Sequence, residues 1–245
     1  MSNLVIRIMS TIIIIDFCDY GHHHRACQQV FLAHGRLWTF AVNNNGDTLV
    51  KVSKETVEQN RERVIDTAAK LFRERGIDGI GVADLMKAAG MTHGGFYRQF
   101  ESKDDLVVQA VTRAFKDMSE DIAKHISTSA DPLQALVRHY VSDYHRDEPG
   151  NGCSLAALAT DASRHDDPNL RGLFDEIVSS YIGLLINLVP DHDAAPRRGT
   201  AIAALSEMIG AVILSRAVRD PALSGEILET VSDDLVRRHA KSKSQ

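Results

Sequence analysis

The chain of 245 residues is long enough for one large domain or two small ones with a real hydrophobic core. With 44% hydrophobic and only 6% aromatic residues, the core must rest on aliphatic side chains, which favours helices over a β-sandwich. Three cysteines do not make a disulfide framework at this length, so we expect a reducing, cytoplasmic location. The apolar run Ile12–Ile15 is too short to cross a bilayer, and we expect no membrane partner.

The net charge of −5 argues against a nucleic-acid partner only when it is averaged over the chain. Residues 126–245 carry twelve Lys or Arg against seventeen Asp or Glu, so the whole acidic excess lies there. Between positions 87 and 100 the only charged residues are Lys87 and Arg98. These counts are compatible with a small DNA-binding head on an acidic body.

Residues 1–50 differ from the rest of the chain. They contain the Ile12–Ile15 run, three successive histidines (His22–His24) and an Asn43–Asn45 tract, and neither helical nor strand periodicity persists for long. We interpret them as an accessory or disordered extension, or as sequence upstream of a mis-set translation start near Val50. Adjacent histidines rarely furnish a complete site, so we predict no metal and no cofactor.

Helical patterning begins at Ser53 and continues to the end of the chain. Glycines in capping positions end the first two helices, at Gly76 and Gly90. Thr92 and Ser102 are suitable N-caps for a short helix to about Gln99 and for a long helix after it. Further helices are predicted, three of them with Pro at the start, over residues 133–145, 153–164, 168–189, 196–218 and 221–239. The prediction is an all-α fold.

The segment between about Val82 and Phe100 has the pattern of a helix-turn-helix. Gly90 tolerates the left-handed geometry of the turn, and Met91 fills the angle between the helices. The second helix is anchored by Phe96 and Phe100 and carries short polar residues outward. The inward face of the first helix is predicted to consist of Val82, Leu85, Met86 and Ala89.

Over about residues 61–111 the chain resembles the TetR/AcrR family of transcriptional regulators. The resemblance rests on Ala68-Ala69-x-Leu71-Phe72, on Gly76 and on Gly90-Met-Thr-x-Gly94-x-Phe96-Tyr97-x-x-Phe100-x-Ser-Lys103. It implies a three-helix DNA-binding head (residues 51–102), joined by a long helix to a helical ligand-binding and dimerisation domain (residues 103–245). It also implies a homodimeric repressor, not an enzyme, that binds double-stranded DNA at a palindromic operator and responds to a small-molecule effector.

The family's DNA contacts map onto a few positions of this sequence. Thr92, His93 and Gly94 open the recognition helix and match positions near bases and phosphates, whereas Tyr97 and Lys103 match phosphate-holding positions. Arg98 is a further outward candidate, and Lys54, with Lys51, lies just before the first helix, within reach of the DNA backbone.

Two glycines depart from the family pattern. Gly95 stands where the family often has Thr or Ser, and Gly81 where a hydroxyl cap is usual. Two glycines inside the recognition helix, Gly94 and Gly95, cost about 1 kcal/mol each relative to Ala. We therefore expect this helix to be soft until DNA orders it, with the backbone able to approach the groove closely.

The resemblance places an effector pocket and a dimer interface in the C-terminal helices. The candidate pocket residues are three tyrosines, which combine an apolar ring with a hydroxyl, together with an apolar phenylalanine and a thiol: Tyr140, Tyr144, Tyr181, Phe174 and Cys153. Cys153 is either a buried structural residue or a sensor of oxidants or electrophiles. A dimer interface is predicted from a stripe of apolar and small residues, namely Ala201, Ile202, Ala204, Leu205, Ile209, Gly210, Ala211, Val212, Ile213, Ile227, Leu228, Val231 and Leu235.

Two other readings remain open at this point. A cysteine-dependent enzyme would use Cys153, but no nucleophile-elbow, Walker or zincin pattern accompanies it. A helical interaction module that has lost DNA binding would follow if Gly81 and Gly95 have disabled the head. Salt-dependent binding to a palindromic DNA fragment separates the regulator from both.

Overall fold

A computed structural model describes residues 3–9, 12–18, 27–33, 36–42, 48–49, 54–189 and 197–239, with side chains for 55–189 and 197–239. The chain divides into two compact units, residues 1–60 and 61–245. All of the described strands lie in the first unit.

The first unit contains a five-stranded antiparallel sheet in the order β1-β2-β3-β4-β5. Its strands are Asn3–Met9, Ile12–Cys18, Cys27–Ala33, Arg36–Val42 and Thr48–Leu49. This sheet was not predicted from the sequence, because the isoleucines that open β2 are continuous rather than alternating with polar residues. Branched side chains favour strands all the same, and Ile15 pairs with Ile6 on one side and Val30 on the other. The histidines at 22–24 and the asparagines at 43–45 lie outside the described residues.

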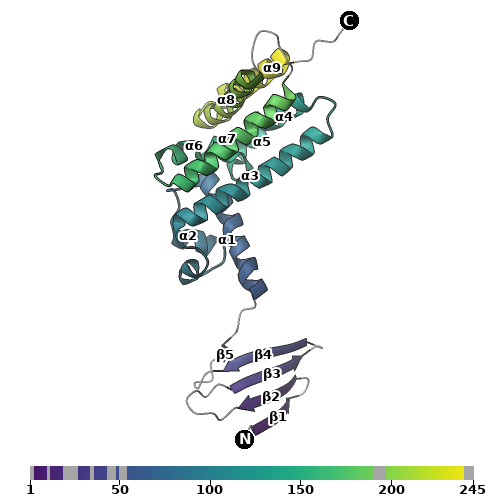
Figure 1. The fold of residues 1–245 in the computed structure, drawn as a ribbon, viewed down its shortest axis with the longest axis vertical. Helices are drawn as coiled ribbons and strands as arrows, with labels where there is room; N and C mark the ends of the chain where they lie inside the picture. The colour runs from purple at the N-terminus through teal and green to yellow at the C-terminus, as the bar shows by residue number, and fades with distance from the viewer. Residues whose placement is uncertain are drawn as a thin grey trace. The chain divides into compact units, whose positions relative to one another are not determined.

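The described residues from 54 on form helices and their connections (Figure 1). The elements are α1 (Lys54–Arg75), α2 (Val82–Ala88), η1 (His93–Arg98), α3 (Lys103–Ser127), α4 (Pro132–Tyr140), α5 (Asp143–Asp147), η2 (Pro149–Asn151), α6 (Ser154–Arg164), α7 (Pro168–Leu188), α8 (Arg197–Ala217) and α9 (Pro221–His239). An N-terminal helix-turn-helix is followed by the long α3 and a helical C-terminal domain. The predicted all-α fold is confirmed for this part of the chain.

Side-chain caps begin several of these helices, as the sequence predicts. Asp131 accepts the backbone N–H of Gln134 at 3.0 Å at the start of α4. Each of the other two Asp-Pro pairs caps its helix in the same manner, with Asp167 before α7 and Asp220 before α9. The proline lies in the first turn, where its missing N–H has no helical partner to lose.

Two elements differ from the predicted ones. The helix expected over 133–145 is interrupted after Tyr140, because the Ser142 hydroxyl accepts the backbone N–H of His145 at 3.2 Å and starts α5 as a separate helix. The recognition segment His93–Arg98 is a 3-10 helix rather than an α-helix. Its two glycines have low α-helix propensity, so the α-helical hydrogen-bond pattern is only weakly favoured in this segment.

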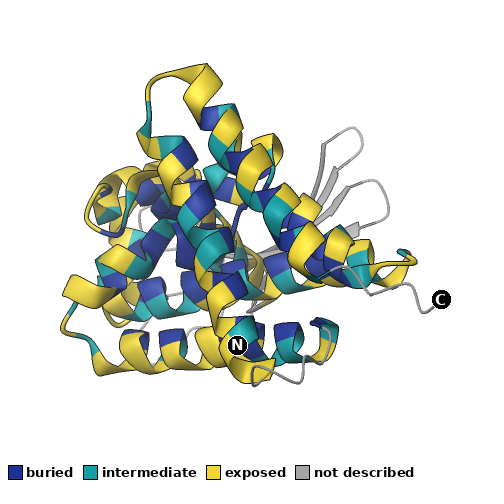
Figure 2. Ribbon diagram, turned by 90° about the horizontal axis from the view of Figure 1, so that it is seen from above, coloured by how far each residue is buried: buried dark blue, intermediate teal, exposed yellow. Residues whose placement is uncertain are grey.

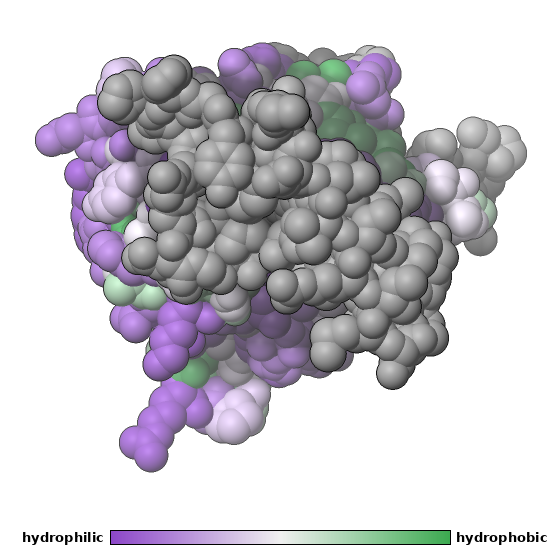
Figure 3. Space-filling view, turned by 90° about the horizontal axis from the view of Figure 1, so that it is seen from below, coloured by the Kyte–Doolittle hydropathy of each residue, from purple (hydrophilic) through white to green (hydrophobic). Residues whose placement is uncertain are grey.

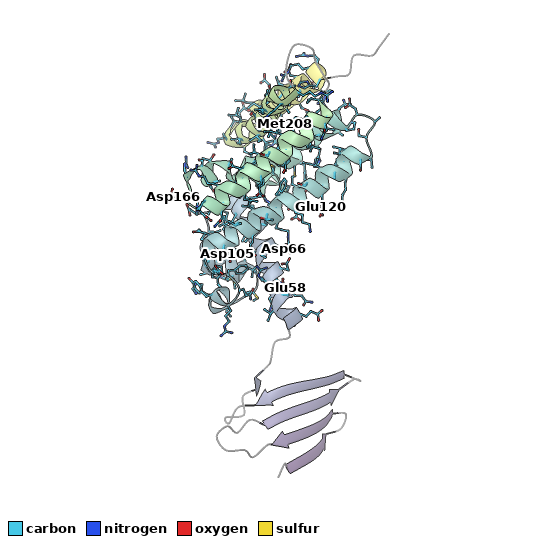
Figure 4. All side chains as sticks on the ribbon, in the orientation of Figure 1. Glu58, Asp66, Asp105, Glu120, Asp166 and Met208 are labelled. Carbon is cyan, nitrogen blue, oxygen red and sulfur yellow. The ribbon has the colours of Figure 1, made fainter. Side chains whose placement is uncertain are left out.

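α3 lies at the centre of a single hydrophobic core, and Figure 2 shows the buried faces of the helices in dark blue. Figure 4 labels Asp105, in the first turn of α3, and Glu120, about two turns before its C-terminal end. The same cluster of buried side chains includes residues of α1, α2 and η1 and of the helices from α4 to α9. The side chains of α3 that belong to it are Leu106, Val107, Ala110, Val111, Ala114, Met118 and Ile122.

α8 is the one helix among the described residues that is long and apolar enough to cross a membrane by length and composition alone. A core helix of a soluble protein passes the same test. Ala201, Leu205 and Val212 of α8 are buried within the chain, whereas Ile202, Ile213 and Leu214 of the same helix are exposed.

The C-terminal end of α1 is tied to the body by polar contacts. Gly76 adopts a left-handed φ of 79°, and its N–H donates to the Phe72 carbonyl at 2.8 Å. The next N–H, of Ile77, donates to the Asp161 carboxylate on α6 at 2.8 Å. The buried Arg73 donates from Nε to the Gly150 carbonyl at 2.9 Å. These contacts hold the end of α1 against the C-terminal domain.

Replacing Gly76 by Ala is expected to destabilise the chain more than the same change at Gly90. Both glycines have positive φ, 79° and 72°, so each alanine costs about 1–2 kcal/mol in the left-handed region. At Gly76 the new Cβ would also lie 2.9 Å from the Asp161 carboxylate, whereas nothing lies within 4 Å at Gly90. Urea unfolding of the two variants measures the difference, and equal losses would show that the α1–α6 contact contributes nothing.

Candidate nucleic-acid interface and buried polar centre

The turn between α2 and η1 is built as the sequence predicts. Gly90 has a φ of 72°, and the N–H of Met91 donates to the Met86 carbonyl at 2.8 Å. Phe96 and Phe100 are buried, with ring centroids 5.4 Å apart. The predicted inward face of α2 is confirmed for Leu85, Met86 and Ala89, which are buried, while Val82 is half-buried against the core.

The opposite side of η1 faces solvent. Thr92, His93, Gly94 and Arg98 are exposed, and Tyr97 is 68% exposed. The Tyr97 ring packs edge-on against Phe96 at 5.1 Å and lies edge-on to His93 at 6.1 Å. Figure 3 draws one face of the molecule, where the coloured surface is mainly hydrophilic with small hydrophobic patches. The buried Phe96 thus anchors a segment whose polar side chains are exposed.

Lys103 is the basic residue at the start of α3. Its side chain is 29% exposed, and its ammonium lies 3.9 Å from the carboxylate of the exposed Asp78. The first turn of α3 is acidic, and the Ser102 hydroxyl already accepts the N–H of Asp105 at 3.0 Å. The attraction of this helix start for a phosphate therefore depends on the Lys103 ammonium more than on free backbone N–H groups. The side chain of Lys54, the first residue of α1, lies outside the described residues, as does Lys51.

Three of the five candidate effector residues come together in the interior. Cys153 is fully buried, and its thiol donates to the Tyr181 hydroxyl at 3.7 Å. The Tyr140 hydroxyl is buried with no hydrogen-bond partner among the described residues, and burial, with Cys153 nearby, raises the pKa of Tyr140 well above its ordinary value. Tyr144 is instead 59% exposed, and Phe174 is buried on α7. The five side chains do not line one common pocket.

His145 is a structural part of this buried polar centre. Its Nδ1 donates to the Tyr140 carbonyl at 2.7 Å, and its Nε2 accepts the backbone N–H of Cys153 at 2.9 Å. Both ring nitrogens are thus used by the backbone, and burial lowers the pKa of His145 from 6.5 to about 4. Gly152 packs so closely that a Cβ there would lie 2.5 Å from the imidazole. His145, on α5, is therefore a buried structural residue rather than a surface histidine.

A small apolar cavity lies between α3 and α7. It has a volume of about 220 Å³ and is lined by Phe115, Ser119, Ile122, Ala123, Ile126, Ser180, Tyr181 and Leu184. Tyr181 joins it to the buried centre, since its ring packs on Phe115 at 5.6 Å while its hydroxyl accepts the Cys153 thiol. Tyr181 was identified from the sequence but the other lining residues were not, because an apolar side chain facing a cavity has the same pattern as one in the core.

The fold and the α2–turn–η1 geometry define a helix-turn-helix DNA-binding regulator. Residues 64–110 match the family model described as bacterial regulatory proteins, tetR family. The chain is 25% identical over 169 residues to the HTH-type transcriptional regulator YxaF of Bacillus subtilis, covering 66% of this chain and 87% of that one. It is 25% identical over 124 residues to the HTH-type transcriptional repressor DhaR of Mycobacterium sp. (strain GP1), covering 49% and 63% of the two chains.

Among solved structures, a TetR-family transcriptional regulator from Cytophaga hutchinsonii superposes with a TM-score of 0.65 at 21% identity, covering 78% of this chain and all of that one. That likeness shows the fold. Residues 64–110 thus match the DNA-binding segment of the TetR family of transcriptional regulators, and the helical part of the chain has the fold of such regulators. Proteins of this family and fold are not enzymes, and the reading of Cys153 as a catalytic residue is set aside.

The buried His145 predicts a loss of stability on mild acidification. Its pKa is about 4 in the folded chain against 6.5 when unfolded, so the unfolded state binds the extra proton between these values. Stability is full above pH 6.5 and falls by about 3 kcal/mol as the pH drops to 4, because each tenfold difference in proton affinity is worth about 1.36 kcal/mol. Urea unfolding at a series of pH values measures this. The variant His145→Gln should show a shallower pH dependence, and parallel curves would contradict the assignment.

Proposed function

We propose that the chain is a homodimeric repressor that binds a palindromic operator and is released from it by a small apolar or electrophilic molecule. The observation that carries the proposal is the arrangement of η1, where buried Phe96 and Phe100 support the exposed Thr92, His93, Tyr97 and Arg98. The repressor role is supported by the similarity to DhaR, which is named as a transcriptional repressor. A reporter gene placed behind the operator tests repression directly.

Within this proposal the candidate DNA-contacting residues divide into two groups. Thr92, His93 and Arg98 contact base edges, where a side chain's hydrogen-bonding pattern distinguishes one base pair from another. Tyr97, Lys103 and Lys54 hold phosphates, which position the head without reading sequence. No atom lies within 4 Å of a Cβ built at Gly94, and Gly95 is half-buried beside Met86, so the backbone itself can lie close to the groove wall.

The dimer interface proposed here is narrower than the stripe predicted from sequence. Seven of its members are buried within the chain and are not available to a partner: Ala201, Ala204, Leu205, Ala211, Val212, Leu228 and Leu235. The face of α8 that remains exposed carries Ile202, Ile213 and Leu214, which are 41%, 40% and 56% exposed. Exposed apolar side chains on one helix support a symmetric contact with a second copy.

The cavity between α3 and α7 supports the effector part of the proposal. At about 220 Å³ it admits only a small apolar molecule without opening further. Such a molecule would contact Tyr181, whose hydroxyl accepts a hydrogen bond from the buried Cys153 thiol. An electrophile in the cavity would reach that thiol only after Tyr181 moved aside, because Cys153 is fully buried and does not line the cavity. Because α3 lines the cavity and also leads into the DNA-binding head, occupancy favours one position of α3 over another and shifts the population of DNA-competent dimers.

Substitutions in the head should separate phosphate contacts from base contacts. Lys103→Ala and Tyr97→Phe are expected to weaken binding to all duplexes alike, and Lys103→Ala should lower the slope of log affinity against log salt by about 0.9. His93→Ala is expected to change the preference among operator variants instead, by about 1–3 kcal/mol at the contacted position. Fluorescence anisotropy with labelled duplexes over a salt series measures both. If His93→Ala leaves the sequence preference intact, the assignment of base contact is wrong.

A substitution at Asp78 is expected to raise the affinity for DNA rather than lower it. Its carboxylate lies 3.9 Å from the Lys103 ammonium and competes with a phosphate for it. Asp78→Asn is expected to raise affinity for every duplex by a few-fold at low salt, because exposed ion pairs contribute up to about 1 kcal/mol. The same anisotropy measurements over a salt series test this. The matched control is Asp84→Asn, because Asp84 is an exposed carboxylate on α2. An equal gain in both variants would mean that net charge, rather than release of Lys103, is responsible.

A further inference from the structure

A cluster of two imidazoles and a carboxylate lies where the C-terminal end of α3 meets α4. Asp121 and His125 are one turn apart on α3, and His139 comes from α4. The Asp121 carboxylate lies 2.6 Å from His139 Nε2 and 3.5 Å from His125 Nδ1. The two rings are stacked, with centroids 3.7 Å apart and an interplanar angle of 18°. One potential ligand atom from each residue lies within 4.8 Å of the others.

The residue types match the donor preferences of a divalent transition metal. Imidazole nitrogen and carboxylate oxygen suit cations of borderline softness such as Zn²⁺, and two histidines with one carboxylate leave a fourth position for water. The i, i+4 spacing places Asp121 and His125 on the same face of α3. His125 Nδ1 also lies 2.8 Å from the Asp121 backbone carbonyl, to which it can donate its proton. That hydrogen bond leaves Nε2 as the ligand atom, as outer-sphere partners of metal-bound histidines usually do.

The surroundings admit an ion and supply oxygen atoms. The cluster opens onto a cavity of about 640 Å³. The side chains of Asp121 and His125 are 43% and 47% exposed, and that of His139 is 16% exposed. Four further side chains with oxygen atoms line the same cavity: Asp117, Ser142, Tyr144 and Asn151. The site is therefore open on one side and bounded by polar atoms on the other.

The positive groups that line the cavity are engaged elsewhere. The guanidinium of Arg138 lies 2.6 Å from Asp233 and donates to Ser232 at 3.2 Å, both on α9. Arg73 donates to the neutral Gly150 carbonyl, and its charge is offset by Asp117, which also lines the cavity. In addition, His125 lies in the last turn of α3, where the helix dipole favours a cation. The local electrostatics thus favour rather than oppose a bound cation.

We propose that Asp121, His125 and His139 form a binding site for a divalent cation of borderline softness, with Zn²⁺ as its representative. Tetrahedral coordination at about 2.0–2.1 Å separates neighbouring ligand atoms by about 3.4 Å. The present spacings, from 2.6 Å between Asp121 and His139 up to less than 4.8 Å, lie on both sides of that value, so the side chains must adjust on binding. A bound ion joins the end of α3 to α4. This inference does not depend on DNA binding and stands if the repressor role fails.

The test is calorimetric titration of Zn²⁺ into the full chain with His22, His23 and His24 all replaced by alanine, which removes the other histidine cluster. We expect one equivalent of Zn²⁺ per chain. His139→Ala and Asp121→Asn should each lower the affinity on the order of 100-fold, at least as much as losing an outer-sphere partner does. The matched control is His165→Ala, because His165 lies 3.6 Å from Asp104 in a histidine–carboxylate pair at the opposite end of α3.

A second readout guards against variants that fail to fold. Co²⁺ bound in place of Zn²⁺ should give the visible absorption of a four- or five-coordinate site in the parent and in His165→Ala, and lose it in Asp121→Asn, whose fold is checked by circular dichroism. Equal Zn²⁺ affinity in the parent and in folded Asp121→Asn and His139→Ala chains, or loss of binding in His165→Ala alone, would overturn the proposal.

Discussion

The structure from residue 54 on depends on one constraint, namely that the helix-turn-helix and the C-terminal helices share a single hydrophobic core through α3. Its buried stripe runs from Leu106 to Ile122 without a break, and the same cluster contains Phe72 and Phe96 of the head and Tyr181 and Leu205 of the body. A helix that packs on both sides in this way cannot shift without altering the packing of both, because protein interiors are close-packed. The position of the head is therefore coupled to the arrangement of the body.

Polar contacts reinforce this coupling. Arg113 of α3 forms ion pairs with Glu62 and Asp66 of α1, and the Asp161 carboxylate of α6 accepts the Ile77 N–H just beyond α1. The two regions to which we assign ligands, the apolar cavity beside Tyr181 and the Asp121–His125–His139 cluster, both lie along α3, beyond the turns nearest the head. A ligand bound at either place would therefore contact the helix that follows η1 directly in the chain.

Much of this structure could be predicted from sequence, because helix boundaries are local features. The Asp-Pro starts, the Ser102 cap and the glycines at 76 and 90 act within one or two turns, and the buried anchors of η1 follow from spacing alone. The break at Ser142 was missed because Leu133–His145 is periodic throughout and only a side-chain cap divides it. His139 comes close to Asp121 only through tertiary packing, so no residue spacing in the sequence indicates the cluster. The sheet of residues 3–49 was missed because its strands do not alternate.

The claim that underlies this account is that the exposed side of η1 reads paired bases. Selection of bound DNA from a random duplex pool by the purified full chain at low salt tests it most directly. The account predicts enrichment of an inverted repeat whose half-sites are about 34–36 Å apart, one helical turn, or a multiple of this. Recovery of a pool with no enriched sequence after repeated rounds, or of no DNA at all, would contradict it.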